Sequence, residues 1–60
     1  MWIVLLKNKV RHSAWLTKGQ AVHQLEVLRD AGVIKLYNQP LKAFITFDDT
    51  VSCEDGHYYV

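Results

Sequence analysis

Two apolar runs open the chain on either side of a short basic stretch. Residues 1–7 and 10–16 have the length and composition of β-strands, and Asn8-Lys9 separates them. Because asparagine tolerates a positive φ angle, this dipeptide predicts a two-residue turn. The two runs are therefore expected to pair as an antiparallel hairpin.

The predicted turn makes this hairpin apolar on both faces, because opposed residues of an antiparallel pair share a face. The expected pairs are Trp2 with Trp15, Ile3 with Ala14, Leu5 with His12 and Lys7 with Val10. One face then carries Met1, Ile3, Leu5, Val10, Ala14 and Leu16, with His12 among them. The other carries Trp2, Val4, Leu6 and Trp15, with Arg11 and Ser13. A single helix covers only one of these faces.

The face left uncovered predicts self-association. Monomers rarely expose large contiguous apolar patches, and tryptophan is enriched at protein interfaces. We therefore expect a homodimer whose interface consists of Trp2, Val4, Leu6 and Trp15. The alternative is burial within one chain, in which the C-terminal residues Tyr58, Tyr59 and Val60 fold over this face.

A helix is predicted over residues 18–31. Thr17 begins a capping box in which Gln20, three residues later, reaches back to the cap. Gly32 would end the helix in the left-handed conformation that glycine adopts readily. The core-facing stripe holds Ala21, Leu25 and Leu28, flanked by Val22 and Ala31, and the outer side holds His23, Glu26, Val27 and Asp30.

The C-terminal half predicts two further strands, at residues 33–37 and 42–47, with a turn at Pro40 between them. Asp55-Gly56 is a strong turn signal that would fold residues 51–54 against 57–60 as a short extra hairpin. The expected fold class is α+β, a two-layer ββαββ domain over residues 1–60 with one helix packed on an antiparallel sheet. The sequence leaves open whether the C-terminal hairpin forms.

Length and cysteine content limit what such a chain can be. Sixty residues, half of them apolar and 22% charged, are typical of one small globular domain. A domain of this size buries only about 60% of its unfolded surface, so small domains often gain stability by oligomerisation. Cys53 is the one cysteine, which excludes an intrachain disulfide and favours the cytoplasm. No apolar segment approaches the roughly 18 residues of a membrane span, so no membrane partner is expected.

Charges are sorted along the chain, although the net charge is only +1. Residues 1–25 contain no acid but hold Lys7, Lys9, Arg11 and Lys18, whereas residues 43–60 contain no Lys or Arg but hold Asp48, Asp49, Glu54 and Asp55. The two groups would complement each other as neighbours in one sheet. Alternatively, the acidic group meets a partner protein, or imitates phosphate toward a nucleic-acid-binding protein. The basic group, with aromatic rings beside it, would instead suit nucleic acid.

Neither metal binding nor catalysis is predicted. Cys53 and His57 are four residues apart, but a structural zinc site needs a second close pair, which His12 and His23 do not supply. The acidic residues lack the spacing of a calcium loop. No nucleophile motif surrounds the cysteine or the serines. We therefore expect no cofactor, no metal and no enzymatic activity.

Two classes of function remain. The first is a small non-catalytic protein-binding module that regulates or inhibits a partner protein as a homodimer. Its small size suits the modulators that phages and mobile elements encode. The second is a nucleic-acid-binding domain based on the basic first hairpin. Salt-sensitive retention on nucleic acid would separate the two.

Overall fold

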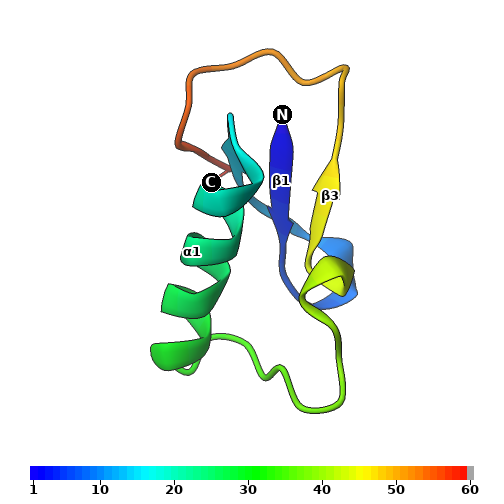
Figure 1. Cartoon of the computed structure of the whole chain (residues 1–60), viewed down its shortest axis with the longest axis vertical. Coiled ribbons are helices and arrows are strands. Elements are labelled where there is room, and N and C mark those ends of the chain that lie inside the picture. The colour runs from blue at the N-terminus through cyan, green and yellow to red at the C-terminus, as the bar shows by residue number, and fades with distance from the viewer. Residues whose placement is uncertain (60) are drawn as a thin grey trace.

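The first hairpin forms the centre of a four-stranded antiparallel sheet with one helix against it (Figure 1). This computed structural model describes residues 1–59. The elements in chain order are β1 (Trp2–Leu5), η1 (Lys7–Lys9), β2 (Arg11–Trp15), α1 (Lys18–Asp30), η2 (Leu41–Ala43), β3 (Ile45–Phe47) and β4 (His57–Tyr58). The strand order is β3-β1-β2-β4. One helix on an antiparallel sheet confirms the predicted α+β class.

The predicted hairpin register is confirmed at its open end and shifted near the turn. Trp2 opposes Trp15 and Ile3 opposes Ala14, but Leu5 opposes Arg11 and not His12. The turn is the three-residue segment η1, in which Asn8 and Lys9 have φ angles of 64° and 61°. The longer turn displaces the pairing by one residue, and a bulge between Val4 and Leu5 restores it.

The helix covers the face that sequence analysis assigned to a second copy. Val4 is fully buried in one cluster with Ala21, Leu25 and Leu28 of α1. The other three residues proposed for self-association pack against the same cluster, namely Trp2, Leu6 and Trp15. Cover for this face therefore comes from the chain itself, so an uncovered Trp face is no longer a reason to expect a dimer.

The connection between β3 and β4 runs past one end of the sheet (Figure 1). Ile3 and Ala14 are fully buried but lie outside the helix-facing cluster. Arg11 on β2 donates to Asp48, directly after β3, at 3.1 Å, so this ion pair crosses the central strand β1. Residues 48–56 arch past the N-terminus toward the far edge of the sheet (Figure 1).

The helix follows the sequence prediction closely. Thr17 accepts a hydrogen bond from the Gln20 backbone, and the Gln20 side chain accepts one from the Thr17 N–H, which completes the capping box. Gly32 has a φ angle of 77° just beyond the helix, and the Val33 N–H bonds back to the Leu28 carbonyl. Local sequence is therefore enough to set both ends of α1.

The two C-terminal strand predictions need correction. Residues 33–37 form no strand, because the chain leaves the glycine cap away from any free sheet edge and reverses again at Asn38, whose φ angle is 60°. The predicted strand at 42–47 shortens to β3, since η2 follows Pro40 and occupies its first part. Pro40 accepts the bond that closes this turn, from the Ala43 N–H.

The predicted C-terminal hairpin does not form as expected. Residues 51–54 form no strand, and β4 pairs with β2, where Tyr58 opposes Ser13 and His57 opposes Ala14. The second edge of β2 is free to pair, and the Gly56 N–H also donates to the Ala14 carbonyl there, at 2.9 Å. Val60, the last residue of the predicted hairpin, lies outside the described residues.

Candidate binding surface

The four basic residues singled out in the sequence do not share one surface. Lys7 and Lys9 lie in the η1 turn, whereas Lys18 is the first residue of the helix and lies toward the other end of the sheet. Arg11 is paired with the Asp48 carboxylate. The fold therefore divides this group, and the expectation that charges complement each other within the sheet holds for the Arg11–Asp48 pair.

Asp48, the first of the four acidic residues, has a local structural role. Its Oδ1 accepts hydrogen bonds from the Thr50 hydroxyl at 2.6 Å and from the Thr50 backbone N–H at 2.9 Å. These two bonds, with the nearby Arg11 guanidinium, lower the pKa of Asp48 below its usual value. The carboxylate thus fixes the start of the 48–56 connection.

Asp55 fixes the other end of that connection. Its carboxylate accepts the Leu16 N–H at 2.9 Å and the Gln20 side-chain amide at 2.8 Å, and these bonds lower the pKa of Asp55. The remaining two acids, Asp49 and Glu54, are exposed on the same connection. Half of the proposed acidic partner site is therefore engaged in holding the fold.

A partly buried polar chain joins Trp15, Ser13 and His12 of β2. The Trp15 indole N–H donates to the Ser13 hydroxyl at 2.8 Å, and His12 Nδ1 lies 3.0 Å from the same oxygen. Since Ser13 already accepts from Trp15, its hydroxyl proton is free to donate to a neutral His12 ring. Burial lowers the pKa of His12, which favours this neutral form.

No group of three or more potential metal ligands (His, Cys, Asp or Glu) gathers in residues 1–59. The Cys53 thiol lies 3.4 Å from the Met1 sulfur, which ties the 48–56 connection to the N-terminal residue. His12 is committed to the Ser13 contact described above. His23 is exposed on the outer side of the helix.

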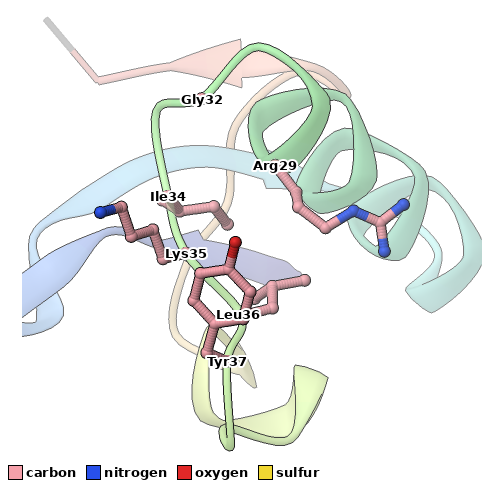
Figure 2. A pocket seen from close by; sticks show the side chains of 6 residues that line it. All are labelled: Arg29, Gly32, Ile34, Lys35, Leu36 and Tyr37. Atoms are coloured by element: carbon pink, nitrogen blue, oxygen red, sulfur yellow. The ribbon is translucent and has the colours of Figure 1, made fainter.

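The candidate surface that sequence reasoning missed surrounds residues 32–37, hereafter the 32–37 surface. Figure 2 shows Tyr37 lying across this segment, with Arg29 and Lys35 on either side of it. Tyr37 is 81% exposed and Val33 is 57% exposed, which is unusual for large apolar side chains this close together. The segment lies at the end of the molecule opposite the 48–56 connection (Figure 1).

Two shallow cavities flank the 32–37 surface. The first, of about 370 Å³, is lined by Arg29, Gly32, Ile34, Lys35, Leu36 and Tyr37. The second, of about 420 Å³, is lined by Lys7, Gly32, Val33, Ile34, Lys35, Gln39 and Phe44. Both linings combine cationic and apolar side chains, and neither contains an acidic residue. The chemistry of both cavities suits an acidic ligand with an apolar group.

One signal in the sequence could have pointed to this surface. Residues 33–37 alternate in exposure, with Ile34 and Leu36 turned inward and Val33, Lys35 and Tyr37 outward. Such alternation is typical of a strand, but it also fits any extended segment with one buried side. The flanking breakers Gly32 and Pro40 indicated that the segment could run as an irregular loop.

No protein-family model, curated protein or solved structure matches this chain. Among the described residues, no helix has the length and apolar character needed to cross a membrane.

Proposed function

We propose that this protein is a non-catalytic binding module that regulates or inhibits a partner protein through the 32–37 surface. The observation that carries this proposal is that two large apolar side chains, Tyr37 and Val33, are exposed. Tyr37 lines the first cavity, Val33 lines the second, and Lys35 lines both. Tyrosine and arginine are enriched at interface hot spots, and both occur here. The module would act by binding to a site on its partner, without chemical change to it.

The charges of this surface define the partner's chemistry. Lys7, Arg29 and Lys35 line the two cavities and no carboxylate does, but Arg29 is paired at 3.4 Å with Asp30 beside the first cavity, so Lys7 and Lys35 carry the charge argument. An acidic segment of a partner protein would gain charge complementarity at the rim, while one apolar side chain enters a cavity. Cavity volumes of this size also match the low end of known binding pockets.

The cavity linings also favour binding over chemistry. They contain no His, Cys, Ser, Asp or Glu, which are the residues that usually act as nucleophiles or general bases. Tyr37 and the lysines would therefore serve as contacts.

The proposal is tested by selecting peptides from a random library on the immobilised parent protein. We expect acidic peptides with one large apolar side chain, whose binding weakens as salt rises. Amide shifts on titration should cluster at residues 32–37, and Lys35→Glu should weaken binding by about tenfold or more. The matched control is Lys18→Glu, which changes the net charge equally but lies at the start of the helix. Selected peptides without acidic bias, or equal binding to Lys35→Glu, would contradict the proposal.

A second candidate, nucleic-acid binding, is favoured by one observation. The exposed Tyr37 ring lies between Lys35 and Arg29, an arrangement that could stack a base and hold its phosphates (Figure 2). Retention on single- and double-stranded DNA and RNA should then be strong at low salt and lost near about 0.5 M salt. Loss on Lys35→Glu would place the site here, and loss only on Lys7→Glu with Lys9→Glu would place it on the first hairpin. No retention at low salt removes this candidate.

A further inference from the structure

The second cavity combines two cations with an apolar lining. Lys7 and Lys35 both line it, and neither side chain has an ion-pair partner in the described part of the chain. Val33, which is 57% exposed, and Phe44 supply apolar surface to the same cavity. A ligand that matches this lining carries a negative charge close to an apolar group.

The first cavity lacks this combination. Its cations are Arg29 and Lys35, but Arg29 is already paired with Asp30 at 3.4 Å. Figure 2 shows the Lys35 side chain extending away from Arg29, on the other side of the segment that carries it. The second cavity is therefore the better place for an anionic group.

We propose that the second cavity binds the C-terminal residue of a partner protein. The α-carboxylate would lie between Lys7 and Lys35, and the apolar side chain of the same residue would lie against Val33 and Phe44. Capture of a terminal carboxylate is a recurring mode of peptide recognition. The inference rests on the function proposed above and specifies which part of the partner is bound.

The geometry of an extended peptide favours a chain end over an internal acidic residue. Neighbouring side chains of such a peptide point to opposite sides, so an acidic residue and an apolar residue next to it do not enter one cavity together. Residues two apart share a side but lie about 7 Å from each other along the chain. A C-terminal residue carries its carboxylate and its side chain on one Cα, so it supplies both groups to one cavity.

Polar groups in the lining favour a peptide over a simple alkyl acid. Gln39 lines the second cavity, and a glutamine amide both donates to and accepts from a peptide group. Within residues 1–59, the backbone N–H groups of Ile34 and Lys35 donate to no backbone carbonyl. A peptide backbone offers partners for these groups, whereas an alkyl chain would exclude water from them without replacing it.

The first test compares four small probes by NMR titration of the labelled parent protein. The peptide acetyl-Gly-Ser-Gly-Leu, with a free carboxylate, should bind about tenfold or more tighter than the same peptide amidated at its C-terminus. It should also bind more tightly than acetyl-Gly-Asp-Gly-Leu-amide and sodium octanoate, which carry the same charge. The largest amide shifts are expected at Val33, Ile34, Lys35 and Gln39.

The second test separates the cavity from general positive charge. Lys7→Ala should weaken binding of the free-acid peptide by about fivefold or more and leave that of the amidated peptide unchanged. Lys9→Ala is the matched control, because it removes the same charge from the same turn but lines neither cavity. Tyr37→Ser, which alters the first cavity alone, should bind the free acid like the parent.

Equal binding of the free-acid and amidated peptides would overturn the inference, as would equal losses for Lys7→Ala and Lys9→Ala. Octanoate or the internal-acid peptide binding as tightly as the free acid would also overturn it. In each case the proposed function still stands if acidic peptides selected from the library bind at residues 32–37. Failure of every peptide to bind there would remove both.

Discussion

At the scale of single residues, Ser13 is the position whose side chain is most closely restricted by hydrogen bonding. It is a fully buried polar residue, and it joins the indole of Trp15 to the ring of His12. A hydroxyl can accept one hydrogen bond and donate another, so one small side chain satisfies both neighbours. No buried side-chain nitrogen or oxygen in residues 1–59 lacks a partner, so the core tolerates its polar groups only because this contact is complete.

Ser13→Ala should therefore be strongly destabilising for so small a change. It removes little volume but leaves the Trp15 N–H and the His12 ring nitrogen without their partner, at a cost of about 1–3 kcal/mol in the free energy of unfolding. Urea denaturation followed by tryptophan fluorescence measures the difference. The control is Ser52→Ala on the exposed connection, which should change stability by less than about 0.5 kcal/mol. Equal effects of the two variants would show that the buried contact contributes little.

At the scale of elements, α1 has both of its ends set by a few local residues. The Thr17–Gln20 capping box satisfies backbone N–H groups that the first turn cannot bond internally. Ala21, Leu25 and Leu28 follow at helical spacing and are buried. The strands are less independent of their context, since residues 33–37 alternate like a strand yet pair with nothing.

Thr17→Ala should lower the free energy of unfolding by about 0.5–2 kcal/mol, because the helix loses its capping hydroxyl. Thr17→Ser should retain most of the stability, since serine caps equally well. Thermal denaturation of the three proteins by circular dichroism makes the comparison. If the alanine and serine variants were equally stable, the cap would have no energetic role in this fold.

At the scale of the whole molecule, the 48–56 connection links the two edge strands of the sheet, β3 and β4. Asp48 holds one end through Thr50 and Arg11, and Asp55 holds the other through Leu16 and Gln20. Both carboxyl groups have a pKa lowered below 3.8 by these partners. Their folded forms therefore bind protons less readily than the unfolded chain does.

Because the pKa of both carboxyl groups is lower in the folded protein than in the unfolded chain, the folded state should lose stability in acid. Stability contributed by the two carboxylates is fully present above the unfolded pKa of about 3.8, and it is lost as the pH falls through the lower folded values. Asp55→Asn should be less stable than the parent at neutral pH, and the difference should shrink on acidification. Urea unfolding across this pH range measures it, with Glu54→Gln as the exposed control. A pH-independent difference would contradict the role assigned to the Asp55 carboxylate.

The molecule also shows why the fold could be predicted from the sequence but the 32–37 surface, which we propose as the binding site, could not. The hairpin, the helix and the α+β class follow from periodicity, capping and turn residues that act over a few positions. The 32–37 surface depends instead on where Gly32 sends the chain and on which sheet edge remains free when it arrives. The grouping of Lys7, Arg29 and Lys35 around two cavities joins three separate segments, which no local pattern specifies.

The sequence by itself determined the helix ends, the Trp2–Trp15 pairing and the two-layer class, because each depends on short-range sterics and hydrogen bonds. Only the tertiary structure decided which face of the hairpin the helix covers, since both faces are apolar and periodicity cannot choose between them. It also decided that β4 joins β2 and that Asp48 and Asp55 hold the connection. These outcomes depend on competition between distant segments for the same edges and faces.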